Sequence, residues 1–294
     1  MDRRSFLNGA GRFAGALAAG AVFETLRPGD AWARQAVNAA SAQVLNRLRT
    51  GFTFQMSVDV ATIEQGLTVA GAALAAGIDI VEMGTPLLKN QGVANVVPAF
   101  RRKFPQALLL ADMKTMDGGA FEARAVYAGG GNIVDFLALA GVDTARAICG
   151  VRDEFRRAEP ERPRLVFADI LVPQQGPAAQ AVDVARRLLD AGVDGVGIHL
   201  QADARRADPA LIERNYLGAI ARALFTAVGG AAPVQVVGGL SVAQAKGLAE
   251  AGLRAFVISG NLGQPDTRAR YDLPPDQIER YVAGFIADVS RTSR

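Results

Sequence analysis

Residues 111–119 read ADMKTMDGG, and they place two carboxylates and a lysine within six positions. Asp112, Lys114 and Asp117 come directly after the apolar run at 107–110, and Lys114 is one of only four lysines in a chain with 28 arginines. Neighbouring carboxylates repel one another unless a cation lies beside them. Mg²⁺ prefers such oxygen ligands, and a lysine next to them stays charged. The stretch therefore suits a reaction in which negative charge develops beside bound cations.

Small and ionisable residues also follow other apolar runs of the chain. They are Asp59, Glu82, Asp169 and the single histidine His199, and further along Gly238, Gly239, Gly260 and Asn261. Alone, such an aspartate caps a helix or closes a turn. Together, the carboxylates of Asp59, Glu82 and Asp112 are costly to hold side by side unless they bind a divalent cation such as Mg²⁺. The glycines leave backbone N–H groups free to hold a phosphate.

Eight short apolar runs, rich in β-branched residues, must position these groups. They lie at 54–60, 79–83, 107–113, 133–138, 165–170, 195–200, 234–237 and 255–259. Most are almost continuously apolar, which is typical of parallel strands covered on both faces. The ionisable residues fall at or near the carboxyl ends of these runs, so they are expected at one edge of a sheet.

Helical patterns alternate with the runs. They cover 63–76, 93–103, 121–128, 144–157, 178–191, 209–227, 242–251 and 275–289, and a further helix is expected at 34–50. Eight strand–helix units predict an α/β fold, a (β/α)8 TIM barrel with an extra N-terminal helix, as a single domain over 34–294. A doubly wound open sheet is the alternative, but it requires a glycine-rich first turn, and residues 59–62 read DVAT.

Composition excludes several classes of protein. The 294 residues carry a net charge of +3, and half of them are hydrophobic. The arginines are scattered, and no basic run is interleaved with aromatic residues, so a solvated surface is favoured over a nucleic-acid interface. One cysteine, Cys149, excludes an intrachain disulfide and is expected to be a small buried apolar residue.

The N-terminus resembles a twin-arginine export signal. Arg3 and Arg4 precede a Ser-Phe-Leu sequence, a modest apolar stretch covers 14–23, and residues 31–33 read AWA. We expect 1–33 to be a signal peptide and the protein to be periplasmic; an ordinary N-terminal extension on a cytoplasmic protein is the alternative. The apolar stretch is too short for a stable membrane anchor.

The spacing of Asp112, Lys114 and Asp117 matches the D-x-K-x-x-D motif of the orotidine 5′-phosphate decarboxylase suprafamily. Residues 55–59 (QMSVD), 80–89 (IVEMGTPLLK) and 111–117 (ADMKTMD) are together similar to the branch of 3-hexulose-6-phosphate synthase and 3-keto-L-gulonate-6-phosphate decarboxylase. The resemblance is strong over 52–140 and weaker, but in register, as far as 240.

The resemblance implies roles for several residues. Orotidylate decarboxylases have a lysine at the position of Glu82, whereas a glutamate there implies that Glu82 and Asp112 bind Mg²⁺. Asp59 and Lys114 would contact substrate oxygens. Asp117 would reach the active site of the neighbouring subunit in a homodimer with shared active sites.

The implied reaction is that of an Mg²⁺-dependent carbon–carbon lyase acting on a sugar phosphate. Proton loss or decarboxylation next to the carbonyl of a ketose phosphate yields an enediolate, and His199 would transfer a proton. In 3-hexulose-6-phosphate synthase the enediolate derived from ribulose 5-phosphate adds to formaldehyde, and this is the activity expected first. Decarboxylation of 3-keto-L-gulonate 6-phosphate or of orotidine 5′-phosphate is the alternative.

Two features depart from the family pattern. Some relatives hold phosphate with an arginine where this chain has Asn261, so Lys246 or a nearby arginine would have to replace it. Residues 199–206 (HLQADARR) match neither branch. An export signal also conflicts with the cytoplasmic location of sugar phosphates. An exported, non-catalytic ligand-binding barrel is therefore a second hypothesis.

Overall fold

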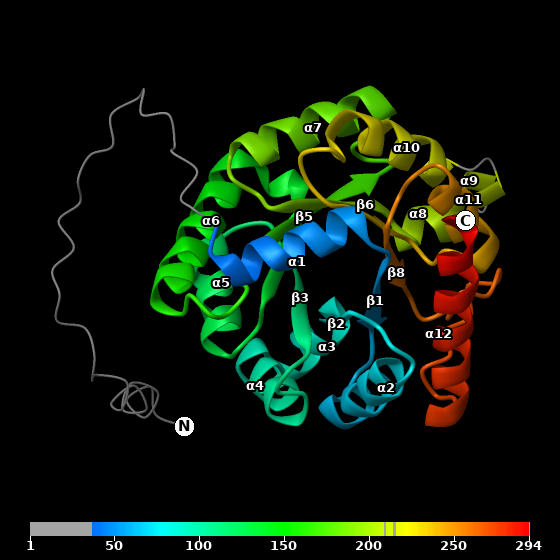
Figure 1. Cartoon of the computed structure of the whole chain (residues 1–294), viewed down its shortest axis with the longest axis horizontal. Helices are drawn as coiled ribbons and strands as arrows, with labels where there is room; N and C mark the ends of the chain where they lie inside the picture. Colours follow the sequence, from blue (N-terminus) through cyan, green and yellow to red (C-terminus); the bar gives the residue numbers. More distant parts are fainter. Residues whose placement is uncertain (1–36, 209, 214–215, 294) are drawn as a thin grey trace, which may run out of the picture. The chain divides into compact units, whose positions relative to one another are not determined.

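The computed structural model describes residues 37–208, 210–213 and 216–293. Eight parallel strands close into a barrel in sequence order, with β1 hydrogen-bonded to both β2 and β8, and helices surround the sheet (Figure 1). The strands are β1 (Thr53–Val58), β2 (Ile80–Met83), β3 (Leu108–Thr115), β4 (Ile133–Leu137), β5 (Leu165–Val172), β6 (Gly195–Leu200), β7 (Val234–Val237) and β8 (Ala255–Ile258). The predicted (β/α)8 barrel is confirmed.

The helices agree with the predicted pattern, with a few additions. They are α1 (Ala39–Thr50), α2 (Ile63–Ala75), α3 (Thr85–Gln91), α4 (Val93–Lys103), α5 (Gly119–Ala128), α6 (Gly141–Ala158), α7 (Ala178–Asp190), α8 (Ala202–Ala207), α9 (Ala210–Glu213), α10 (Tyr216–Val228), α11 (Val242–Glu250) and α12 (Pro275–Ser290), with the 3₁₀ turns η1 (Ala138–Ala140) and η2 (Arg291–Ser293). The short helices α3 and α8 were not expected from the sequence. The single helix expected at 209–227 is instead α9 and α10.

Two strands extend beyond their predicted ends. β5 continues to Val172, so Asp169 lies inside the strand rather than at its end. β3 continues to Thr115, with a shift in register between Asp112 and Thr115. The predicted strands ended one residue after Asp112 and one residue after Asp169, but buried polar side chains at a barrel mouth do not interrupt the backbone hydrogen bonds of a strand.

The extra helix α1 is confirmed, and it closes the amino-terminal end of the barrel. Leu48 of α1 joins a separate apolar cluster with residues near the starts of four strands, Ile80, Leu110, Ile133, Leu165 and Phe167. Asn38 caps the helix by accepting a hydrogen bond from the backbone N–H of Ser41, 2.8 Å away. Ser41 then exchanges hydrogen bonds with the backbone of Arg164, just before β5. The opposite, carboxyl end of the barrel is therefore the open end.

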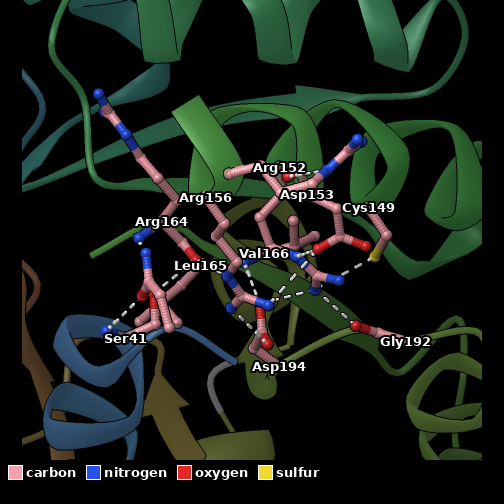
Figure 2. A network of polar contacts seen from close by, with 12 residues as sticks. Ser41, Cys149, Arg152, Asp153, Arg156, Arg164, Leu165, Val166, Gly192 and Asp194 are labelled. Atoms are coloured by element: carbon pink, nitrogen blue, oxygen red, sulfur yellow. Dashed lines mark hydrogen bonds and ion pairs between the residues drawn. The ribbon is translucent and has the colours of Figure 1, made fainter. Parts of the chain in front are cut away.

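A buried ion network fastens α6 to the starts of β5 and β6 (Figure 2). Asp194, just before β6, accepts from Arg152 at 2.8 Å and from Arg156 at 2.9 Å. The same carboxylate accepts from the backbone N–H of Val166 at 2.9 Å, and Arg156 also donates to the carbonyl of Arg164 at 2.8 Å. Every charge in this group is paired or hydrogen-bonded, as buried charges must be.

Cys149 lies beside this network and is buried, as expected. Burial is the main reason that the pKa of its thiol rises to about 12, so the thiol stays protonated at neutral pH. The expected signal peptide at 1–33 lies outside the described residues. Within the described part of the chain, no helix combines the length and the apolar character that crossing a bilayer requires.

We expect Asp194→Asn to lower the free energy of unfolding by about 3 kcal/mol, because the buried guanidinium groups of Arg152 and Arg156 then keep only Asp153, at 2.8 and 3.6 Å, as a counter-charge. Urea denaturation followed by circular dichroism measures this loss. Asp183→Asn is the matched control, because the Asp183–Arg187 pair is largely exposed, and it should change the free energy by less than about 0.5 kcal/mol. Equal effects of the two substitutions would show that the buried network is not what stabilises this side of the barrel.

Candidate active site

Three of the predicted carboxylates meet at the open end of the barrel. Glu82 lies in β2, Asp112 lies in β3 and Asp59 directly follows β1. One carboxylate oxygen from each lies within 4.8 Å of those of the other two. Such a set of oxygen ligands fits a hard divalent cation such as Mg²⁺.

Hydrogen bonds from the barrel interior hold Glu82 in place. Its two carboxylate oxygens accept from Gln55 Nε2 at 2.5 Å and from Ser57 Oγ at 2.9 Å. Gln235 of β7 donates to Gln55 Oε1 at 2.9 Å, which fixes the orientation of the Gln55 amide. These buried side chains form a polar layer below the carboxylates and leave the Glu82 carboxylate few rotamers.

Burial raises the pKa of Glu82 well above its ordinary value, and the carboxylates of Asp112 and Asp59 raise it further. Burial is also the main reason that the pKa of Asp59 is raised, again with a contribution from Asp112. Both groups therefore take up a proton more readily than an ordinary carboxylate does. A bound divalent cation would stabilise the ionised forms, so the charges of the trio fit the expected metal.

The Asp59 carboxylate is held from two sides. Ser57 Oγ lies 2.9 Å from Asp59 Oδ2, and Tyr271 Oη approaches the same oxygen at 3.4 Å while donating to the carbonyl of Ser57 at 2.8 Å. Residue 84 must be a glycine, because a Cβ there would lie 2.1 Å from Asp59 Oδ1. The loop after β2 can therefore pass close to the carboxylate.

Lys114 projects from the register shift in β3, where its backbone has a φ of 46°. Its Nζ lies 2.8 and 2.7 Å from the two oxygens of Asp112 and 3.5 Å from Asp169 Oδ2. Thr85 Oγ1 donates to Asp112 Oδ2 at 2.8 Å. Burial alone would lower the pKa of Lys114, but Asp112 and Asp169 outweigh it and raise the pKa. The lysine is therefore a fixed positive charge in the mouth of the barrel.

A second group of carboxylates adjoins the first through Asp112. Asp135 of β4 lies opposite Asp112 in the strand register, and Asp135, Asp112 and Asp169 also have oxygens within 4.8 Å of one another. His199 Nδ1 lies 2.8 Å from Asp169 Oδ2. Burial opposes ionisation of Asp169, but His199 and Lys114 lower its pKa to about 2. Asp169 is thus an ionised partner that orients the His199 ring.

Asp135 differs from Asp169 in the direction in which its pKa is shifted. Burial is the main reason that the pKa of Asp135 is raised well above its ordinary value, with Asp169 adding to the effect. Its Oδ1 atom has no hydrogen-bond partner among the described residues. Asp135 therefore takes up a proton more readily than an ordinary aspartate does.

Sequence reasoning overlooked Asp135, Gln55 and Tyr271. Asp135 carries a usable signal, since an acidic residue within an apolar strand requires an explanation. Tyr271 carries none, because it reaches Asp59 from the loop between β8 and α12, across more than 200 positions of sequence.

Asp117 does not join this cluster within the subunit. Its side chain is exposed and accepts a hydrogen bond from the backbone N–H of Gly118 at 2.7 Å. Three large apolar side chains on the neighbouring segments are also exposed, namely Met116 (52%), Phe121 (83%) and Leu139 (45%). The surface next to Asp117 is thus unusually apolar for one in contact with water.

The glycines expected to bind phosphate lie at the ends of β7 and β8. Gly238 and Gly239 have φ values of 137° and 68°, which favour glycine. The Asn261 side chain joins the two strand ends, because its amide donates to the carbonyls of Gly239 at 3.0 Å and Gln264 at 2.6 Å. Among the described residues, the backbone N–H groups of Gly239 and Gly260 donate to no acceptor.

Comparisons with known proteins show the family of this chain. Residues 53–209 match the model of the orotidine 5′-phosphate decarboxylase / HUMPS family. The chain is 29% identical to 3-hexulose-6-phosphate synthase from Mycobacterium gastri over 206 residues, which cover 70% of this chain and 89% of that relative.

Two solved structures have the same fold. A crystal structure of 3-hexulose-6-phosphate synthase has a TM-score of 0.62 and 25% identity, covering 79% of this chain and 99% of the other. A crystal structure of KGPDC from Streptococcus mutans has a TM-score of 0.65 and 20% identity, covering 82% of this chain and 98% of the other. At that identity the second likeness concerns the fold alone.

The matched segment, 53–209, contains every residue of the two carboxylate groups as well as Lys114, Asp117 and His199. The ends of β7 and β8 lie beyond it. The chain therefore belongs to the orotidine 5′-phosphate decarboxylase / HUMPS family. Within this family it is a lyase of the branch that contains 3-hexulose-6-phosphate synthase and 3-keto-L-gulonate-6-phosphate decarboxylase (KGPDC).

Proposed function

We propose that the protein is an Mg²⁺-dependent lyase that acts on a ketose phosphate through an enediolate, most like 3-hexulose-6-phosphate synthase. The observation that carries the proposal is the convergence of Asp59, Glu82 and Asp112 on one point beside the charged Lys114. Glu82 and Asp112 would hold the ion. When bound, Mg²⁺ would supply a positive charge that stabilises an anionic oxygen.

The chain's own residues account for the remaining chemistry. Lys114 is a permanent cation in a buried site, where it stabilises the negative oxygen of an enediolate more strongly than it would in water. Asp59 can accept a hydrogen bond from a substrate hydroxyl. Because Asp169 holds Nδ1 of His199, Nε2 is the nitrogen that can give or take a proton.

The relatives favour aldol addition of formaldehyde to ribulose 5-phosphate, and decarboxylation of a keto-gulonate phosphate is the second candidate. Both reactions pass through an enediolate, formed by proton loss in one and by loss of carbon dioxide in the other, so the cluster serves either. Decarboxylation of orotidine 5′-phosphate is disfavoured by Glu82, since a lysine is expected at this position in that enzyme. A non-catalytic exported barrel would keep the same residues without turnover.

We also propose that two copies form a homodimer in which Asp117 completes the partner's site. The exposed apolar side chains of Met116, Phe121 and Leu139 beside Asp117 support this arrangement, because such a surface is stabilised by burial against another copy.

Glu82→Gln should abolish formation of the hexulose phosphate from ribulose 5-phosphate and formaldehyde, and should weaken Mg²⁺ binding by more than about 100-fold. The amide keeps the shape of the side chain but removes its charge. Calorimetric titration of Mg²⁺ and a product assay with and without Mg²⁺ measure the two effects. Glu154→Gln is the control, since Glu154 pairs with Arg124 on the surface.

The pH dependence of Mg²⁺ binding, measured by the same calorimetric titration, provides a second test of the proposed ligand set. The pKa values of Glu82 and Asp59 are raised, so both groups bind protons at pH values where an ordinary carboxylate is ionised. Protons then compete with Mg²⁺, and the wild-type affinity should fall as the pH is lowered from 7 to 5. An unchanged Mg²⁺ affinity in Glu82→Gln would contradict the proposed ligand set.

Mixing Asp117→Asn with Lys114→Met should restore activity, although each variant alone is inactive. A heterodimer has one site with both wild-type residues, so a 1:1 mixture should reach roughly one quarter of the wild-type rate. Rates after mixing and re-equilibration test this, with sedimentation confirming that dimers form. A mixture of dimers that stays inactive would contradict the shared site.

We propose a periplasmic location through the sequence that begins at Arg3 and Arg4, with the cytoplasm as the alternative. The double substitution Arg3→Lys and Arg4→Lys should retain the protein in the cytoplasm, because that export route requires the arginine pair. Fractionation of cells expressing either form measures the distribution. The same distribution for both forms would remove the export hypothesis.

A further inference from the structure

Arg205 of α8 lies against the glycines at the end of β7. Its Nη1 donates to the carbonyl of Gly238 at 2.7 Å. A Cβ on residue 239 would lie 2.0 Å from this nitrogen, so Gly239 leaves room for the guanidinium group. The arginine thus reaches, from α8, the end of β7, which carries the free backbone N–H group of Gly239.

The guanidinium group of Arg205 has unused donors. Among the described residues, Nη1 has an acceptor, whereas Nε is buried without a partner. An arginine has five N–H donors, and leaving a charged donor buried and unpaired costs free energy. An anion at the end of β7 would remove that cost.

Two other polar side chains near the ends of β7 and β8, those of Arg270 and Asn261, already have hydrogen-bond partners, and the side chain of Lys246 is exposed. Arg270 donates to the carbonyls of Asn261 at 3.0 Å and Arg268 at 2.9 Å, and it also pairs with Asp266. The amide nitrogen of Asn261 bonds to backbone carbonyls. Lys246 is exposed on α11. Among the cations that the structure describes beside these glycines, Arg205 is therefore the one with donors to spare.

We propose that Arg205 holds the phosphate of the substrate in this chain. The guanidinium fork would bind two phosphate oxygens, and the backbone N–H groups of Gly239 and Gly260 would complete the site. This inference rests on the proposed function for the identity of the substrate. The chemistry recognised, a phosphate monoester dianion, follows from the guanidinium fork and the two backbone donors.

Replacing Arg205 by methionine tests the proposal. Arg205→Met should raise the KM for ribulose 5-phosphate by roughly 10- to 100-fold, the range expected for losing a charge-assisted hydrogen bond. Mg²⁺ affinity should not change, which also shows that the variant is folded. Arg205→Lys should fall between wild type and Arg205→Met, because it keeps the charge but loses the fork. Arg206→Met is the matched control, since Arg206 is exposed and pairs with Asp203.

Binding of inorganic phosphate, measured by calorimetry, separates this proposal from the proposed function. A wild-type enzyme that turns over ribulose 5-phosphate, together with an unchanged KM in Arg205→Met, would overturn the role of Arg205 alone. A wild-type protein without turnover whose phosphate binding is lost in Arg205→Met, but kept in Arg206→Met, would support Arg205 and overturn the proposed function. Wild-type protein that binds neither phosphate nor ribulose 5-phosphate would overturn both.

Discussion

Repulsion between buried carboxylates is the constraint on which the open end of this barrel depends. Five of them, Asp59, Glu82, Asp112, Asp135 and Asp169, surround a single lysine. The protein separates their states of charge: Lys114 and His199 keep Asp169 ionised, whereas burial moves Glu82, Asp59 and Asp135 towards their neutral forms. A cation that binds among so many closely spaced carboxylates is strongly stabilised, because it favours their ionised forms.

The rest of the molecule keeps these groups from moving apart. Parallel strands in fixed register set the spacing between carboxylates on neighbouring strands, as for Asp112 and Asp135. The glutamines below them provide hydrogen bonds where an apolar layer would leave Glu82 unsatisfied. At the amino-terminal end, the α1 cluster and the network around Asp194 supply packing and ion pairs that are remote from the chemistry. Stability and function thus occupy opposite ends of the barrel.

The sequence predicts the repeating part of this structure well and the irregular part poorly. Apolar runs and helical periodicity predict all eight strands, because each run must be buried on both faces. The convergence of Asp59, Glu82 and Asp112 then follows from the geometry of any such barrel. The register shift that directs Lys114 inward is a local departure that no periodic pattern records.

Contacts made by loops are also beyond the reach of sequence patterns. Tyr271 comes from a loop and Arg205 from the short helix α8, and the placement of both segments depends on packing, so neither residue is marked by its spacing from the strand ends. Asp135 is different, because an acid inside an apolar strand is visible in the sequence and its burial could be inferred. The Asn261 amide is used to tie two loops together, a role that its position after β8 does not reveal.

Closure of the barrel floor by α1 has a practical consequence. Residue 37 enters the described structure at the end of the barrel that lies away from the carboxylates, since α1 packs against the starts of the strands. A carrier protein, a surface linker or a bead attached at this point would leave the mouth facing the solution. The barrel is therefore suited to immobilisation through residue 37, with substrate still able to diffuse freely to the opposite face.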